Sequence, residues 1–494
     1  MSYLSEIIQK ESLNDFSSIK ELNEIPEGSE SLIFENLFSH LNKDFLIITR
    51  DLKRFQQIKD TMEFFLKSDT LFFPQWDCVP YDRISPNKTI TSNRLETLST
   101  LANDKRDRKI VLSTIQSACQ RTLPINEIKN KSINLKPGQV INVDELLLFF
   151  INNGYSKVGT VREFGEFSIR GGIIDFYSPL NLPIRLDLFG STIESIKGFD
   201  LISQRSVGTI KDIKIFPSAE VSLNDLTIEN FRKNFNQTFG SQKEKVKLYE
   251  SVSEGITYPG MEHWIPFFYN QTGTIFDYLK NPIIILDSSY KDSLENFLET
   301  VNDHYNSRNE YDNNKLSKTE NKYFSLKPDQ LYQDKETFLE NLSESNTLEI
   351  SPFKKPSGIN FNGKMSNKYF GKDGKKYNSD SYQSLKSDID NYLSDNKVII
   401  IACSSPGSED RITKILNNYN INTSSLKQDE FNTNNLNSSV YTVILNLNSG
   451  FLIEKYAFIS EQDIFGEKFY RPRVIRKAEN FLREVSSIMP GDAV

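Results

Sequence analysis

The stretch FLIIT at residues 45–49, followed by DLKRFQQIKDTMEFFL at 51–66, decides the fold class of this chain. The first segment is a short apolar run that predicts a buried strand, and in the second segment apolar residues recur at helical spacing. Two further apolar runs, TLFFP at 70–74 and IVLST at 110–114, predict further strands. Strands and helices that alternate in this way predict an α/β sheet in residues 1–124.

The composition sets limits on function. The 494 residues contain 59 Lys and Arg against 66 Asp and Glu, for a net charge of −7. This length suggests about three domains, and the acidic balance gives no overall positive field for nucleic acid, so any DNA contact must be local. The cysteines Cys78, Cys119 and Cys403 lie far apart without C-x-x-C spacing, which argues against a disulfide framework or a zinc knuckle.

The sequence shows no sign of a membrane segment. Its start lacks a basic stretch followed by an apolar run, and no apolar run reaches the roughly 18 residues of a membrane span. We therefore expect a cytoplasmic protein without a membrane partner.

The pattern changes between about 125 and 217. Asn142 is placed to cap a helix that ends at Gly154, and FGEFSIRGGIIDFYS and LPIRLDLFG follow. Alternation along the second of these segments puts Arg185 and Asp187 on one face of a strand and its aliphatic residues on the other. We expect a small, mostly antiparallel sheet module inserted between α/β segments.

After this module the α/β pattern returns. Residues 218–345 complete the first α/β domain, 346–364 read as a linker, and 365–465 read as a second, smaller α/β domain. Residues 466–494 read as a basic linker. Its tract RPRVIRK at 471–477 either contacts nucleic acid or is a solvated face, and two nearby glutamates favour the second reading.

A search for phosphate-binding loops finds one near-match. GINFNGK at 358–364 satisfies G-x-x-x-x-G-K, but Met365 replaces the Ser or Thr that would bind Mg²⁺, and no apolar helix follows. In the first domain IPEGSESLIFENL lacks a lysine after Gly28, and Asp287 at the end of a strand is more typical of a helix cap. We therefore expect no nucleotide chemistry and no cofactor in this chain.

Metal and nucleophile motifs are also missing. The three histidines are far apart, and the sequence has neither H-E-x-x-H nor G-x-S-x-G. We expect no metal site and no hydrolytic site. The histidines are His40, His263 and His304.

One cluster suggests recognition of another protein. Arg170, Arg185 and Phe189 lie in the small sheet module, and an aromatic residue flanked by arginines has the composition of an interface hot spot. The alternative is that Phe189 belongs to the core and the arginines pair with Asp187 and Glu194. The residues alone leave both interpretations open.

Several segments together resemble the amino-terminal half of bacterial transcription-repair coupling factors. The middle module also resembles the UvrA-binding domain of the excinuclease protein UvrB, but the PGMEHW and ISEQDIFGE segments favour the coupling factors. The matching segments are FPQWDCVPYDRISP with NRLETL, FGEFSIRGGIIDFYSP with IRLDLFGSTIESIKGFD and SQRS, PGMEHWIPFFY, ISEQDIFGE, RKAENF and PGD.

The resemblance implies a fold. Residues 1–124 and 218–345 would form a degenerate helicase-like (RecA-like) α/β domain that has lost nucleotide binding, and 125–217 an inserted α+β UvrA-binding module. Residues 365–465 would form a further small α/β domain of unassigned role. The damage-binding hairpin of UvrB has no room between Phe73 and Pro80.

The resemblance also implies a function. The chain would be a non-catalytic adaptor that recruits UvrA in transcription-coupled nucleotide excision repair, through Arg170, Arg185 and Phe189, with Asp187 and Glu194 at the rim. We expect a fragment in which residues 466–494 are a basic linker and the truncated start of the RNA polymerase-interacting domain. It would lack the rest of that domain and the translocase motor, which would use ATP and Mg²⁺. DNA contact would be weak or indirect.

Two rival functions are also compatible with the sequence. The chain could be a nucleotide-dependent DNA repair enzyme resembling UvrB, which its phosphate loop would reveal. It could also be a DNA-binding module that uses its basic tail, which would give steeply salt-dependent binding.

Overall fold

The structure is a computed structural model that describes residues 19–66, 68, 70–103, 108–129, 131–178, 182–240, 246–313, 323–369, 379–427, 431 and 436–466. The chain divides into two compact units: residues 1–25 with 30–361 belong to unit 1, and residues 26–29 with 362–494 to unit 2. The predicted basic linker, apart from Gly466, lies outside the described residues.

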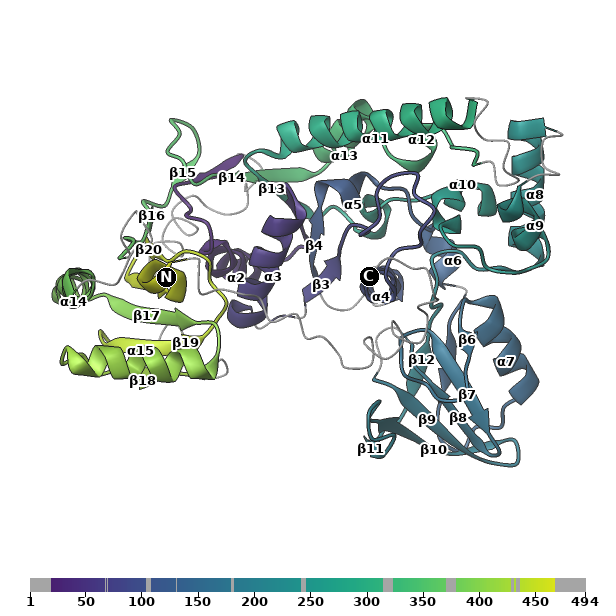
Figure 1. The fold of residues 1–494 in the computed structure, drawn as a ribbon, viewed down its shortest axis with the longest axis horizontal. Coiled ribbons are helices and arrows are strands. Elements are labelled where there is room, and N and C mark those ends of the chain that lie inside the picture. Colours follow the sequence, from purple (N-terminus) through teal and green to yellow (C-terminus); the bar gives the residue numbers. More distant parts are fainter. Residues whose placement is uncertain are drawn as a thin grey trace, which may run out of the picture. The chain divides into compact units, whose positions relative to one another are not determined.

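Unit 1 is built on a seven-stranded sheet in which all neighbouring strands are parallel (Figure 1). The apolar runs at 45–49, 70–73 and 110–114 are strands of this sheet, so the predicted α/β class is confirmed. In the order in which they lie side by side, the strands are β15 (Ile359–Asn360), β1 (Glu21–Asn23), β14 (Asn346–Ile350), β13 (Ile283–Asp287), β2 (Phe45–Thr49), β4 (Ile110–Thr114) and β3 (Thr70–Phe73).

The central strands β2, β4 and β13 are buried along their whole length. A parallel strand reads as a continuous apolar run when helices cover both faces of its sheet, which is why the sequence signal was clear. Besides the helix at 143–152 of the inserted module, the described helices of unit 1 are α2 (Glu30–His40), α3 (Leu52–Phe65), α4 (Lys88–Asn103), α5 (Ile115–Cys119), α6 (Ile125–Lys129), α8 (Asp225–Phe239), α9 (Lys247–Ser253), η3 (Met261–Trp264), α10 (Ile265–Phe268), η4 (Ile275–Tyr278), α11 (Tyr290–Asn313), α12 (Pro328–Leu331) and α13 (Lys335–Ser343).

The range 346–364 differs from the linker that we expected. It contains β14 and β15, which pair in parallel with β13 and β1 of the main sheet. The near-match to a phosphate loop runs from this range into β16 (Lys364–Met365). The motif therefore lies across two short strands and does not open a helix, which removes the geometry that phosphate binding needs.

The inserted module contains a second sheet of unit 1, with six strands. Its strands pair antiparallel except for the pair of β6 and β7, as predicted for the module. Asn142 caps α7 (Val143–Asn152) by accepting from the amides of Asp144 and Glu145. The six strands, in spatial order, are β11 (Ser206–Thr209), β10 (Thr192–Phe199), β9 (Ile184–Phe189), β8 (Ile173–Phe176), β7 (Glu166–Arg170) and β6 (Ser156–Lys157).

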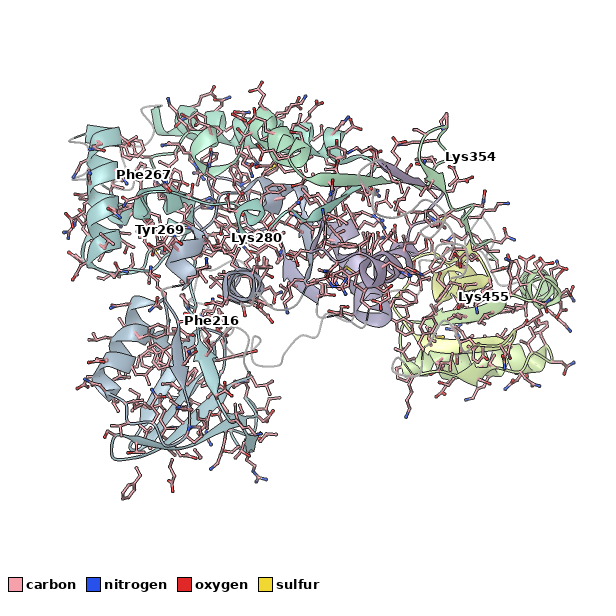
Figure 2. All side chains as sticks on the ribbon, turned by 180° about the vertical axis from the view of Figure 1, so that it is seen from behind. Phe216, Phe267, Tyr269, Lys280, Lys354 and Lys455 are labelled. Carbon is pink, nitrogen blue, oxygen red and sulfur yellow. The ribbon has the colours of Figure 1, made fainter. Side chains whose placement is uncertain are left out.

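The module has its own core. One face of the six-stranded sheet packs with α7 and with a two-stranded sheet of β5 (Ile133–Leu135) and β12 (Ile213–Ile215). Phe150 of α7 stacks on Phe167 of β7, with ring centroids 5.0 Å apart. The chain leaves the module at Phe216, which is labelled in Figure 2. The carbonyl of Phe216 accepts from the hydroxyl of Tyr155 at 2.6 Å. The opposite face of the sheet is left for other interactions.

Unit 2 is a small α/β unit with a six-stranded sheet. Its central strand β17 (Val398–Cys403) is fully buried and runs parallel to both of its neighbours. The remaining elements of unit 2, besides β16, are α14 (Ser379–Ser394), α15 (Pro406–Asn418), β18 (Ser424–Ser425), β19 (Val440–Ile444), β20 (Phe451–Ile453), β21 (Tyr456–Ser460) and α16 (Glu461–Phe465).

Candidate protein-binding surface

The outer face of the six-stranded sheet carries the predicted binding residues, arranged in rows across the strands. Residues directly opposite one another on neighbouring antiparallel strands point to the same face. In one row Asp175 of β8 faces Arg185 of β9, and Arg185 faces Lys197 of β10. In the next row Arg170 of β7 lies opposite Ile173. The sheet thus brings Arg170 and Arg185 to the same face.

Asp175 joins the two arginines. Its carboxylate, whose side chain is 0% exposed, accepts from Arg170 at 2.6 Å. It also accepts from Nε of Arg185 at 2.7 Å and from Nη2 of Arg185 at 3.0 Å. A buried carboxylate needs such charged partners to offset its desolvation. The arginines therefore pair with Asp175, and not with Asp187 and Glu194 as the alternative interpretation proposed.

The two arginines differ in what they leave for a partner. The side chain of Arg185 is only 13% exposed, and Arg185 also donates to the carbonyl of Gln204 and the hydroxyl of Ser206. Its guanidinium lies 5.1 Å from the ring centroid of Phe199, and its hydrogen bond to Asp175 raises its pKa. The Arg170 side chain is 47% exposed. Arg170 is therefore the better placed of the two for an external carboxylate.

Asp187 and Glu194 occupy separate positions. Asp187 accepts from the Lys197 ammonium at 2.8 Å and from the Ser195 hydroxyl at 2.7 Å. Burial opposes ionisation of Asp187, but these two hydrogen bonds outweigh it and lower the pKa of the carboxyl. Glu194 is exposed at a register shift in β10. The outer face thus combines three cations with three carboxylates and is not uniformly positive.

Phe189 stands at the end of β9 and is 82% exposed. The two-residue turn that follows it begins with Gly190, whose φ of +61° suits the left-handed region that such hairpins require. The next turn along the sheet contains Gly172, where a Cβ atom would lie 2.7 Å from the carbonyl oxygen of Leu188. An aromatic side chain this exposed lacks a role in the core, so the reading of Phe189 as a core residue is not supported by its position.

Asp175 was absent from the residues that we singled out from the sequence. The signal that reveals it is the two-residue turn at Gly171–Gly172, which sets the register between β7 and β8. That register places Asp175 on the same face as Arg170. Alternation along β8 alone does not give this result, because β8 is nearly all apolar.

A second buried ion network lies in unit 1, between the start of α2, helix α3 and the carboxyl end of β13 of the main sheet. Arg54 of α3 pairs with Glu30, the first residue of α2, and with Asp287 at the end of β13 at 3.4 Å. Arg50 adds a contact to Asp287 at 3.1 Å. The side chains of Glu30, Arg54 and Asp287 are each less than a tenth exposed. A carboxylate at the start of α2 would repel a phosphate there.

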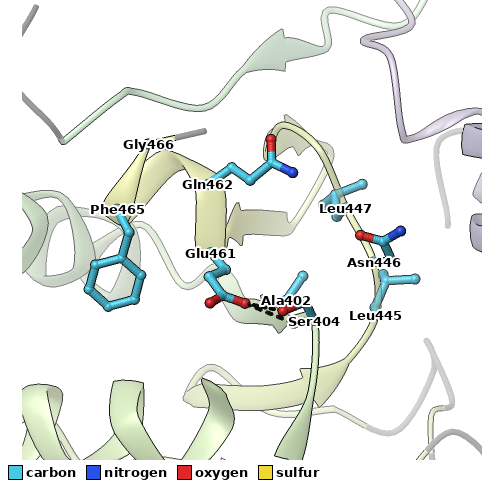
Figure 3. Close-up of a pocket in the computed structure, with 9 residues that line it drawn as sticks. All are labelled: Ala402, Ser404, Leu445, Asn446, Leu447, Glu461, Gln462, Phe465 and Gly466. Carbon is cyan, nitrogen blue, oxygen red and sulfur yellow. Dashed lines mark hydrogen bonds between the residues drawn. The ribbon is translucent and has the colours of Figure 1, made fainter. Parts of the chain in front are cut away.

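A small pocket of unit 2 lies at the carboxyl ends of β17 and β21, where ligands of α/β sheets commonly bind (Figure 3). However, the Glu461 carboxylate accepts from the amide of Ser404 at 3.0 Å and from its hydroxyl at 2.6 Å. The two donors of Ser404 at this pocket thus already bind a carboxylate of the protein itself.

The described part of the chain shows neither a metal site nor a membrane helix. Within it no three His, Cys, Asp or Glu side chains are grouped so that they could hold a metal ion. His263 is buried, and its Nε2 lies 3.9 Å from the sulfur of Cys78. Burial raises the pKa of Cys78 to about 12, which keeps the thiol protonated at neutral pH. None of the described helices combines the length and apolar character of a membrane span.

Comparison with known proteins identifies the type of protein to which the small sheet module and the whole chain are similar. A family model described as the UvrB interaction domain matches residues 133–220. The chain is 29% identical to the transcription-repair-coupling factor of Rickettsia bellii, over 95% of this chain and 41% of that protein. It is 30% identical to that of Rickettsia typhi, over 93% of this chain and 40% of the relative. Against the Escherichia coli protein it is 29% identical over 51% of this chain and 22% of that protein.

The matches cover only part of the length of these relatives. It spans about two fifths of the length of the Rickettsia relatives. The arginine-bearing sheet lies within the range of the UvrB interaction domain. The chain is therefore a relative of the amino-terminal part of transcription-repair coupling factors and contains a UvrB interaction domain.

Proposed function

We propose that this chain is a non-catalytic adaptor that recruits UvrA during transcription-coupled nucleotide excision repair. The observation that supports this most directly is the outer face of the UvrB interaction domain. There Arg170 and Phe189 are exposed, and the buried carboxylate of Asp175 pairs with both Arg170 and Arg185. A partner with carboxylates beside an apolar pocket would satisfy both exposed groups.

The network around Arg54 supports the non-catalytic part of the proposal. The guanidinium bridges Glu30 and Asp287, so a bound nucleotide would have to displace buried ion pairs. Breaking such a pair typically costs about 3–5 kcal/mol. We propose that this domain binds no nucleotide, and that motion along DNA and contact with RNA polymerase belong to parts of the coupling factors that this chain does not span.

The test of recruitment is a titration of the purified chain with purified UvrA. The wild-type chain should bind, and the double variant R170A/F189A should bind at least about tenfold more weakly, since each residue would be a hot spot. R162A, which removes another exposed arginine of the same module, serves as the matched control and should bind normally. Equal binding by wild type and R170A/F189A would overturn the site assignment.

The test of the non-catalytic assignment uses a fluorescent ATP analogue. We expect no saturable binding at micromolar concentration. Saturable binding that is lost in K364A would instead favour a nucleotide-dependent enzyme resembling UvrB.

A further inference from the structure

A third row of side chains crosses the outer face beyond the predicted binding residues. Phe189 lies opposite Thr192 across the hairpin between β9 and β10. On its other side Thr192 lies opposite Val140, which forms an isolated antiparallel bridge with it. Opposed residues share a face of the sheet, so Phe189, Thr192 and Val140 form one continuous row on the outer face.

The backbone fixes Val140 firmly in this row. The amide of Ile141 donates to the carbonyl of Ser191 at 2.8 Å, and the amide of Ile193 donates to the carbonyl of Gln139 at 2.9 Å. These two bonds flank the pair of Val140 and Thr192. The pair itself is therefore of the non-hydrogen-bonded type, in which opposed side chains approach most closely. Val140 and Thr192 are thus in contact range without any rearrangement.

Val140 lacks a structural reason to be apolar. Val140 is 68% exposed. The apolar members of the row are Phe189 and Val140, which stand at its two ends. An exposed valine on its own needs no explanation, but here it extends an exposed aromatic residue into a ridge that spans three neighbouring chain segments. This ridge ends beside the turn that follows Arg170.

We propose that Val140 is a second apolar anchor of the UvrA-binding surface. The inference rests on the proposed function and deepens it, because it states the shape that the partner must have. The partner presents an apolar groove long enough to cover Phe189, Thr192 and Val140, with a carboxylate near one end of the groove to meet Arg170. The ridge lies on the same face of the sheet as the rows that carry Arg170 and Arg185, so we assign it to the same partner.

The experiment is a titration of UvrA with single-residue variants of the purified chain. V140D should weaken binding at least about tenfold, because it sets a charge against an apolar groove, and V140T, which keeps the branched shape, should weaken it roughly threefold. V207D is the matched control. Val207 is 61% exposed in the same module, but it lies opposite Gly198, on the other face of the sheet, so V207D should bind normally.

The outcomes separate a failure of the Val140 inference from a failure of the proposed UvrA binding. Loss of binding in V140D with normal binding in V207D supports the ridge. If the wild-type chain binds UvrA and F189A weakens this binding, but V140D and V140T bind like wild type, the inference is overturned while the proposed function stands. If the wild-type chain does not bind UvrA, both are overturned. Hydrogen exchange of β10 checks that V140D remains folded. If V140D does not remain folded, the binding of V140T decides the test.

Discussion

Arg170 and Arg185 share one carboxylate, yet their removal should have different effects. R170A leaves Asp175 with both of its bonds from Arg185, and a half-exposed ion pair contributes at most about 1 kcal/mol. R185A removes two bonds to Asp175, the bonds to Gln204 and Ser206, and the contact with Phe199. Arg170 then remains as the charged partner of a carboxylate that is fully buried.

The magnitude follows from the burial of Asp175. Removing one partner of a buried ion pair costs about 3–5 kcal/mol, and the remaining bond from Arg170 favours the lower end of that range. At about 1.36 kcal/mol per factor of ten, a loss of about 3 kcal/mol corresponds to roughly a 100-fold or greater increase in local opening. We therefore expect R185A to weaken UvrA binding mainly by loosening β8 and β9, and R170A to weaken it by losing a direct contact.

The assay is amide hydrogen exchange of β8 and β9 in the intact chain, measured beside UvrA titration. R185A should lose about 100-fold protection in these strands, and R170A should change less than about tenfold. Adding D175N to R185A should restore part of the protection, because a neutral amide does not require a cationic partner. Unchanged protection in R185A, with no effect of D175N in that background, would refute this account of the surface.

Three further predictions concern other residues of unit 1. R54L should lower the free energy of unfolding by about 3 kcal/mol in urea melts, since Glu30 and Asp287 lose a buried cation; an unchanged midpoint would contradict this. G172A should reduce protection of β8 and β9 and cost about 1–3 kcal/mol, because its Cβ would meet the Leu188 carbonyl; normal protection would count against it. Burial raises the pKa of Glu262 from 4.5 to about 7, so the free energy of unfolding of the wild-type chain should fall as pH rises through that window. In urea melts E262Q should be more stable than wild type by up to about 3 kcal/mol at pH 8, but by little at pH 4.5. Equal gains at both pH values would contradict a raised pKa of Glu262.

The parts of the fold that could be predicted are those with a local periodic pattern of apolar residues. The strands at 45–49, 110–114 and 283–287 are buried on both faces, so each appears as an unbroken apolar run. Asn142 was recognisable as a cap because its side chain reaches amides only two and three residues away. Alternation in β9 likewise separated the face of Arg185 from the core.

What the sequence could not show depends on pairing between distant residues. The two-residue strand β15 leaves almost no periodic signal, and it exists because β1, far earlier in the chain, offers it an edge. The partners of Arg54 come from α2 and β13, which are widely separated in the sequence. Asp175 and Val140 became visible as parts of the binding surface through strand register. The Gly171–Gly172 turn indicates that register for Asp175, whereas the bridge between Val140 and Thr192 joins segments far apart in the sequence.

The ion pairs of Arg54 also bear on how this domain can change during evolution. A substitution of Glu30 by a residue that suits phosphate would leave the Arg54 guanidinium buried with less compensation. A substitution of Arg54 would remove a buried cation from the carboxylates of Glu30 and Asp287, although Arg50 would still contact Asp287. Each single substitution towards a phosphate-binding site therefore lowers stability before any binding can be gained. Under the proposed function, these ion pairs oppose the gain of a nucleotide site, because each intermediate sequence is less stable than the present one.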